Sequence, residues 1–237
     1  MAVFIALLLA FIYGRKVLSD TQDRSIFMAS SLVGNTGNLG IPLGIALFGV
    51  ASVPYTSILN IANIFYIYIF SVYFFAGDKF SFKDALFEIF KIPAIWVAFL
   101  ALAFNAYGFE LNADFENVFT MGAYAAIVMQ LVIFGVFMSQ VKLKSANWKL
   151  SLNITLFKHI LLPLIGLVVI VYFDLSPFVA SIIFLELMVP LAVNNVNLSA
   201  LYNCKPIDTT MAVLVSSFAF VALIYFYILI MQHFFGV

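Results

Sequence analysis

The chain has 237 residues, of which 65% are hydrophobic and only 9% are charged, and its net charge is zero. Ordinary soluble domains contain roughly 45–50% apolar and about 25% charged residues, so this composition excludes a soluble globular protein. No block of like charges suggests a nucleic-acid partner, and the single cysteine, Cys204, excludes an internal disulfide and a cysteine-based metal site. We therefore predict an all-α integral membrane protein whose solvent is membrane lipid, with no cofactor.

Apolar stretches long enough to cross a bilayer as helices recur along the chain. The first of them, MAVFIALLLAFIYG, has neither a basic region before it nor a small-residue cleavage site, so it predicts a retained span rather than a signal peptide. Breaks at charged residues or at Pro and Gly divide the chain into about eight predicted transmembrane helices, at residues 2–18, 25–49, 54–76, 92–108, 118–140, 152–173, 177–201 and 208–235.

The charges in the loops test this division independently of hydropathy. Ten of the eleven basic residues fall in alternate loops: Arg15, Lys16, Arg24, Lys79, Lys83, Lys91, Lys142, Lys144, Lys149 and Lys205. The loops assigned to the other side hold Glu110, Asp114, Glu116 and Asp174. This bias follows the positive-inside rule and predicts a multi-pass protein of the cell membrane with both termini outside.

Two predicted helices are interrupted at matching depths. The second contains GNTGNLGIP (34–42), and the seventh contains PLAVNNVNL (190–198). The first of these helices runs from inside to outside and the other runs back. Interrupted helices in corresponding places and opposite orientations indicate an inverted repeat with a binding site near the midplane. We expect a partial first repeat at 1–76, a cytoplasmic linker at 77–91 and a second repeat at 92–237.

The residues of these breaks suit an anion. In this prediction Pro42 opens the outer half-helix, and the amides near Leu39–Leu43 direct the positive end of its dipole toward the midplane. Neutral amide side chains can hold a carboxylate and release it. A single Gly or Pro in a membrane helix usually indicates packing or a kink, but two matched breaks favour a substrate site formed by Asn35, Thr36, Asn38, Pro42, Pro190, Asn194, Asn195 and Asn197.

Three further polar residues lie at membrane depth. Glu186, one helical turn before the second break, is either a proton or sodium site or a neutralised structural carboxylate. Lys158 is expected to extend to the cytoplasmic face, with pairing to substrate or to Glu186 as the alternative. His159 is expected at the interface rather than in a proton relay.

The segments GNTGNLGIPLGIALFG (34–49) and MVPLAVNNVNLSALYNCKP (188–206) resemble the auxin efflux carrier family, which includes bacterial permeases for malate and related acids and the plant PIN-formed auxin carriers. The segments IPAIWVAFLALAFNAYGFEL (92–111) and KHILLPLIGL (158–167) add to the likeness. The resemblance implies ten helices in two inverted five-helix repeats, with broken fourth and ninth helices crossing at the substrate site. It places Asn35, Thr36, Asn38, Pro42, Pro190, Asn194 and Asn195 in that site.

The chain departs from this family at its beginning, because its second predicted helix resembles the family's fourth. Three helices precede the linker and five follow it, so we expect an incomplete version of the ten-helix fold. In that case the uncovered faces of the first half would meet lipid or a second copy of the protein in a homodimer.

The function predicted from these features is secondary active transport of small organic anions such as carboxylates, coupled to H⁺ or Na⁺. A channel would need a continuous polar lining on several helices, whereas polarity here is concentrated at two breaks. An enzyme would need a nucleophile with a base or a metal cluster, and the two histidines, His159 and His233, are far apart in the sequence. A non-transporting sensor, a partner subunit and an inactive truncated carrier remain the alternatives.

Overall fold

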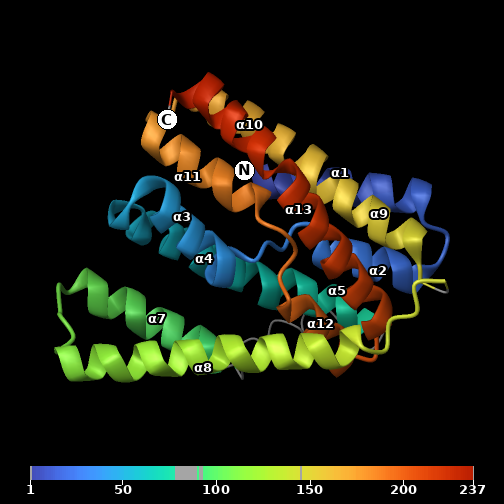
Figure 1. The fold of residues 1–237 in the computed structure, drawn as a ribbon, viewed down its shortest axis with the longest axis horizontal. Helices are drawn as coiled ribbons and strands as arrows, with labels where there is room; N and C mark the ends of the chain where they lie inside the picture. The colour runs from blue at the N-terminus through green and yellow to red at the C-terminus, as the bar shows by residue number, and fades with distance from the viewer. Residues whose placement is uncertain (1, 78–89, 91–92, 145, 237) are drawn as a thin grey trace.

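The structure is a computed structural model that describes residues 2–77, 90, 93–144 and 146–236. The predicted linker at 77–91, with Lys79, Lys83 and Lys91, lies almost entirely outside the described residues. Helices make up the regular structure of the described part of the chain, which also has one isolated antiparallel bridge between Gly34 and Leu191 (Figure 1).

Although the helices at Thr21, Ala113 and Trp148 begin about four or five residues earlier than predicted, the described helical segments overlap the predicted ranges. Those before the linker are α1 (Ala2–Val17), α2 (Thr21–Ser30), η1 (Thr36–Gly40), α3 (Ile41–Phe48), η2 (Val50–Ser52), α4 (Val53–Tyr66), η3 (Ile67–Ser71) and α5 (Val72–Ala76). Those after it are α7 (Pro93–Ala106), α8 (Ala113–Met138), α9 (Trp148–Leu156), η5 (Phe157–Leu161), α10 (Leu162–Tyr172), α11 (Pro177–Met188), α12 (Asn194–Leu201) and α13 (Pro206–Phe235).

Side-chain caps and prolines explain where several helices begin. Asn112 accepts a hydrogen bond from the Phe115 amide, so α8 starts at Ala113, earlier than predicted. Asn147 caps α9 in the same way through the Leu150 amide. Prolines occupy the first turns of α4, α11 and α13, where a missing N–H leaves no intrahelical bond unmade.

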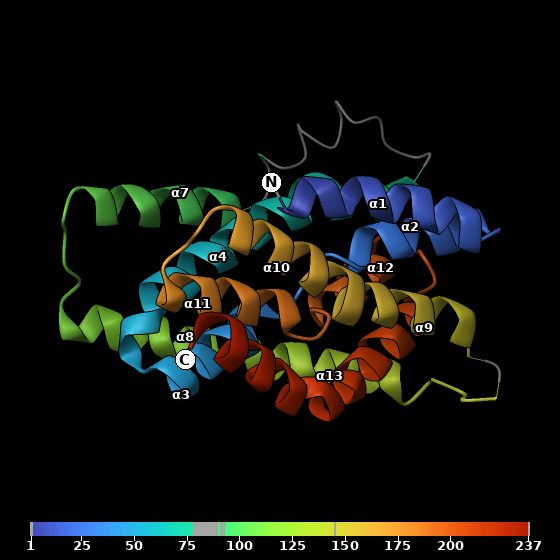
Figure 2. The ribbon, with the colours of Figure 1, turned by 90° about the horizontal axis from the view of Figure 1, so that it is seen from above.

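Three helical segments are long and apolar enough to cross a membrane by length and composition: Val50–Ala76, Trp148–Tyr172 and Pro206–Phe235. Shorter apolar helices run from Thr36 to Phe48 and from Pro177 to Met188. The α7–α8 hairpin runs along one side of the bundle, and its loop extends past the bundle's end (Figures 1 and 2). Leu100 and Met121 in this hairpin are 69% and 71% exposed, which suits a lipid solvent.

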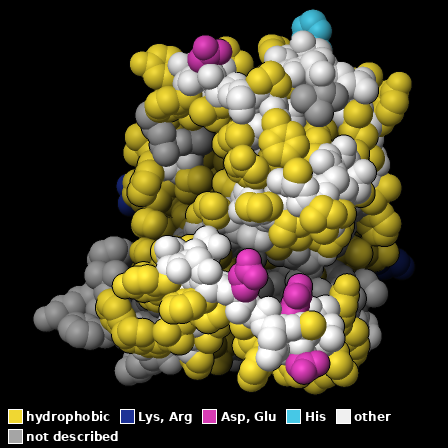
Figure 3. Space-filling view, turned by 90° about the vertical axis from the view of Figure 1, so that its left-hand side faces the viewer, with side chains coloured by type: hydrophobic (Ala, Val, Ile, Leu, Met, Phe, Trp, Pro, Cys, Tyr) yellow, Lys and Arg dark blue, Asp and Glu magenta, His cyan; other side chains and the backbone are white. Residues whose placement is uncertain are grey.

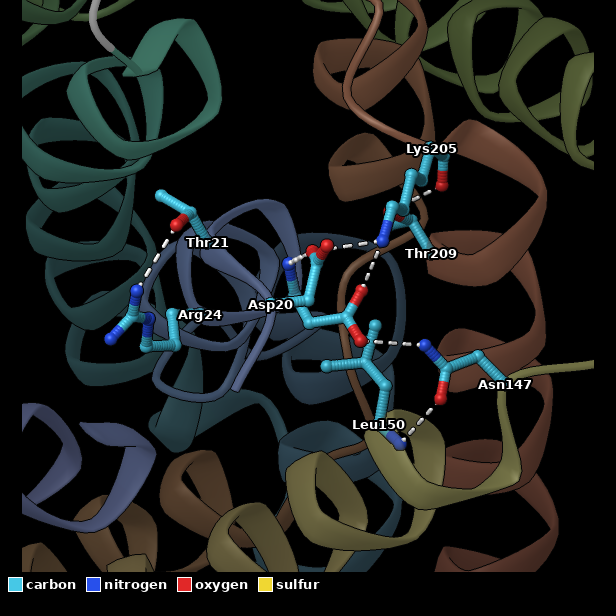
Figure 4. A network of polar contacts seen from close by, with 8 residues as sticks. Asp20, Thr21, Arg24, Asn147, Leu150, Lys205 and Thr209 are labelled. Atoms are coloured by element: carbon cyan, nitrogen blue, oxygen red, sulfur yellow. Dashed lines mark hydrogen bonds and ion pairs between the residues drawn. The ribbon is translucent and has the colours of Figure 1, made fainter. Parts of the chain in front are cut away.

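The two ends of the bundle differ in charge. Figure 3 shows the end that carries the α7–α8 loop, where hydrophobic side chains cover much of the surface. Acidic side chains are visible on this end, whereas Lys and Arg are visible only at its edges. At the opposite end a polar network joins three loops (Figure 4). Lys205 donates to Asp23 at 2.6 Å and to Asp20 at 2.9 Å, and Asn147 donates to the second oxygen of Asp23 at 2.8 Å.

This network changes the titration of its members. The hydrogen bond from Lys205 lowers the pKa of Asp20 below its ordinary value. Burial by itself lowers the pKa of Lys205, but the bonds to Asp23 and Asp20 outweigh burial and raise that pKa overall. The attraction therefore stabilises the fold above the ordinary Asp pKa of about 3.9 and below the ordinary Lys pKa of about 10.4, and it is lost on either side of that window.

We expect Lys205→Met to lower the free energy of unfolding by about 1 kcal/mol or less near neutral pH, because these charges are partly exposed. Thermal melts of the purified protein should show the difference from wild type shrinking as the pH falls below about 4. Lys149→Met, at an exposed lysine of α9, is the control and should leave the melting curve unchanged at each pH. A pH-independent difference would contradict the assignment.

Candidate functional site

The first break separates α2 from η1. The chain leaves the helix after Ser30 and resumes it at Thr36, in one π-helical turn that runs directly into α3. The prediction that Pro42 opens the half-helix is therefore wrong. The amides of Leu39 and Gly40 already bond to the Asn35 carbonyl, so the helix begins a turn earlier.

The π turn explains how Pro42 is accommodated. A proline inside a helix lacks an N–H and its ring clashes with the carbonyl four residues before it. A π turn shifts the bonding to five residues, as in the bond from the Ile41 amide to the Thr36 carbonyl. The η5 turn precedes Pro163 with the same spacing, so both prolines follow a widened turn.

The second break separates α11 from α12 and pairs with the first. Val189 is extended, the conformation that a following proline such as Pro190 favours. The Asn35 amide donates to the Pro190 carbonyl at 2.8 Å, and the Ala192 amide donates to the Val33 carbonyl at 3.1 Å. Each break thus supplies partners for backbone groups that the other has freed from its helix.

The paired breaks border a cavity of about 250 Å³. Asn35, Thr36, Asn38 and Asn194 line it, so the structure brings these four predicted residues together. Pro42, Pro190, Asn195 and Asn197 are not among its lining residues. The side chain of Asn195 is fully buried, and neither of its polar atoms has a hydrogen-bond partner among the described residues.

Two asparagines of α4 that sequence reasoning missed also line this cavity. Asn63 donates to the Gly34 carbonyl at 2.9 Å and to the Thr36 hydroxyl at 3.0 Å. The Thr36 hydroxyl in turn donates to Asn60 at 2.8 Å. The three-residue spacing of these asparagines on an otherwise apolar helix puts them on one face, and that spacing was the available signal.

The three glycines of the first break each make room for a polar side chain. A Cβ at Gly37 would lie 3.0 Å from the Asn60 oxygen, and one at Gly34 would lie 2.9 Å from the Lys158 ammonium. A Cβ at Gly40 would overlap the Glu186 carboxylate. These close contacts support the packing interpretation of the glycines.

The structure also corrects the expectation for Lys158. This residue is 1% exposed and does not extend to the membrane surface. Its ammonium donates to the Leu187 carbonyl at 3.0 Å, at the end of α11, where helix carbonyls lack intrahelical partners and a cation is favourable. Glu186 is 5% exposed, and it lines a second cavity of about 520 Å³ together with Lys158.

His159 is likewise buried rather than interfacial. Its Nε2 lies 2.9 Å from the Ser216 hydroxyl and its Nδ1 lies 3.0 Å from the Tyr227 hydroxyl, which donates to the His159 carbonyl. Ser216 also accepts the Leu191 amide at 3.0 Å. One neutral tautomer with the proton on Nδ1 satisfies every donor and acceptor, so we assign His159 to supporting the second break.

Among the described residues, the paired breaks carry no nucleophile–base pair. They offer neutral donors and acceptors around a small cavity inside an apolar bundle. A family model described as a membrane transport protein matches residues 1–85 and 79–228. The chain belongs to this membrane transport protein family. A comparison with curated proteins gave no match. The transporter family includes the auxin efflux carriers.

For the transporter, we expect Gly40→Ala to destabilise the fold by about 1–3 kcal/mol, because the added methyl group must displace the buried Glu186 carboxylate. Gly122→Ala on α8 is the matched control, since no atom lies within 4 Å of a Cβ at that position. The control should be neutral or stabilising by up to about 1 kcal/mol. Equal melting temperatures of the two variants would show that Glu186 does not lie against Gly40.

We expect Asn63→Leu to lower the free energy of unfolding by about 1–3 kcal/mol, because the Gly34 carbonyl and the Thr36 hydroxyl lose a donor inside the bundle. Asn105→Leu, on an exposed part of α7, serves as the control. Chemical denaturation in detergent micelles measures both variants, and an unaffected Asn63→Leu protein would contradict this role.

Proposed function

We propose that the chain is a secondary active transporter of the auxin efflux carrier type, and that it binds small organic anions such as carboxylates in the cavity between its two breaks. The observation that carries the proposal is that two helices begin at the same polar cavity. The η1–α3 helix begins at Thr36 and α12 begins at Asn194, and both residues line the cavity. The first turn of a helix attracts anions through its dipole and its N–H groups. In α12 the Asn195 and Val196 amides already donate to backbone carbonyls, so the dipole supplies the attraction there.

The size and chemistry of the cavity favour a small carboxylate. Its volume of about 250 Å³ is below the roughly 300–1,000 Å³ typical of pockets for drug-sized ligands. Its asparagines supply neutral donors that can grip a carboxylate without a permanent ion pair. A carrier must release its substrate on the far side, so a moderate grip is an advantage.

We also propose that two parts of the chain form an inverted repeat. Its first part comprises residues 1–76 and its second part residues 92–237, with a cytoplasmic linker at 77–91 and eight helices crossing the cell membrane. The matched breaks support it, because each lies between two helical halves and each pairs with the other. Alternating access would then arise when one part rocks against the other around the breaks.

Within this proposal, Asn35, Thr36, Asn38 and Asn194 contact the substrate. Pro42, Pro190, Asn195 and Asn197 shape the breaks that present them. Glu186 and Lys158 form the coupling site for H⁺ or Na⁺, as charged residues inside a membrane bundle commonly do. The exposed apolar faces of the α7–α8 hairpin suit contact with lipid or with a second copy in a homodimer.

The test is uptake of radiolabelled malate and other small carboxylates into proteoliposomes that contain the purified protein. Asn194→Leu should weaken substrate binding by about 1–3 kcal/mol, because it removes a donor and leaves a bound carboxylate without a partner. Asn105→Leu, which is remote from the cavity, should transport like wild type. Substrate affinity that is unchanged in Asn194→Leu would contradict the location of the site.

A further inference from the structure

Two charged side chains from the second half of the chain flank the first break. Lys158 reaches Gly34 and Glu186 reaches Gly40, and in both places a Cβ would collide with the charged group. Glycine at these positions therefore lets two charges approach the backbone on which the proposed anion site is built.

The two charges interact without forming a direct ion pair. Lys158 and Glu186 line the same cavity and interact electrostatically, but the Lys158 ammonium donates to the Leu187 carbonyl. Both Glu186 oxygens are buried and lack a hydrogen-bond partner among the described residues. A buried carboxylate in this condition is stable only when a proton or a nearby positive charge compensates it.

Only a short stretch of backbone separates this pair from the proposed anion site. Gly34, Thr36 and Asn63 line both the larger cavity with the two charges and the smaller cavity between the breaks. A change of charge at Glu186 would therefore alter the electrostatic energy of an anion in the smaller cavity, because few residues separate the two and screening by water is weak inside the bundle.

We propose that Glu186 is the proton-binding site of the carrier and that Lys158 is its built-in counter-charge, so that a proton rather than sodium accompanies the anion. When Glu186 takes up a proton, the pair changes from neutral to a net charge of +1, and the anion is attracted. When Glu186 releases the proton, its negative charge cancels that of Lys158. Sodium has no comparable place, because it would lie beside the Lys158 ammonium, which repels a second cation.

Other titratable groups near Glu186 do not substitute for Lys158. Tyr66 of α4 lines the same cavity but is neutral near neutral pH. His159, next to Lys158 on η5, points instead to Tyr227 and Ser216 on α13. Among the described parts of η1, α10 and α13 that pack against α11, we find no further charged group facing the carboxylate. The proton and the anion must strengthen each other's binding equally, since linkage is reciprocal.

This inference rests on the proposed function for its anion half, whereas the proton site can be tested without substrate. Difference infrared spectroscopy of the purified protein during a pH titration reports the C=O band of a protonated carboxyl group. We expect a band that titrates in wild type, disappears in Glu186→Gln, and is unchanged when choline is replaced by sodium. Absence of a Glu186-dependent band, or a midpoint that sodium shifts, would overturn the proposal.

Lys158→Met tests the counter-charge. Loss of the ammonium should move the midpoint of the Glu186 band to higher pH by about 1 to 3 units, the usual effect of a nearby opposite charge on a carboxyl group. Lys149→Met makes the same chemical change at an exposed lysine and should leave the midpoint in place. A midpoint that is the same in both variants would show that Lys158 is not the counter-charge of Glu186.

Malate binding measured over the same pH range tests the link to the anion. Wild-type affinity should fall about fivefold or more as Glu186 loses its proton, within the usual range of coupling between sites. Glu186→Gln should keep a constant affinity. A malate affinity that does not change with pH would overturn the coupling between Glu186 and the anion, but it would not contradict the proposed function. Absence of malate binding at every pH would contradict the proposed function instead, and the infrared band alone would then decide the proton site.

Discussion

The structure depends on the exchange of backbone hydrogen bonds between two segments that have left their helices. An unpaired amide or carbonyl inside an apolar bundle is costly, so a helix can break there only if its freed groups find partners. The bonds from Asn35 to Pro190 and from Ala192 to Val33 meet this need in both breaks at once. Asn63 and Ser216 satisfy further groups from neighbouring helices, and the polar cavity results from this arrangement.

The second break, at the end of α11, also explains why charged side chains are tolerated deep in the bundle. The end of α11 presents carbonyl groups without helical partners, and Lys158 binds one of them. The glycines at 34 and 40 let Lys158 and Glu186 lie against the opposite segment. Backbone geometry, small residues and buried charges therefore form one unit, in which a change at any member is expected to affect the others.

The sequence predicted much of this fold, because apolar length, Pro and Gly mark helices and their breaks in a membrane protein. It also led to four residues that line the cavity. It failed where the outcome depends on packing between distant segments. The half-helix starts at Thr36 because of a π turn, which we did not predict from the local sequence. The burial of Lys158 and His159 depends on partners 29 to 68 residues away. Asn60 and Asn63 were visible as a pair, but their role required knowledge of which helix faces the break.

The most direct test of the central claim is the position of a bound anion. A brominated dicarboxylate, soaked into crystals of the purified protein, can be located by the anomalous scattering of its bromine. The account predicts a bromine peak in the cavity lined by Asn35, Asn38, Asn60 and Asn194, with the carboxylates directed at the helix starts. A peak in the larger cavity beside Lys158 and Glu186, or a structure in which α2 and α3 form one unbroken helix, would contradict it.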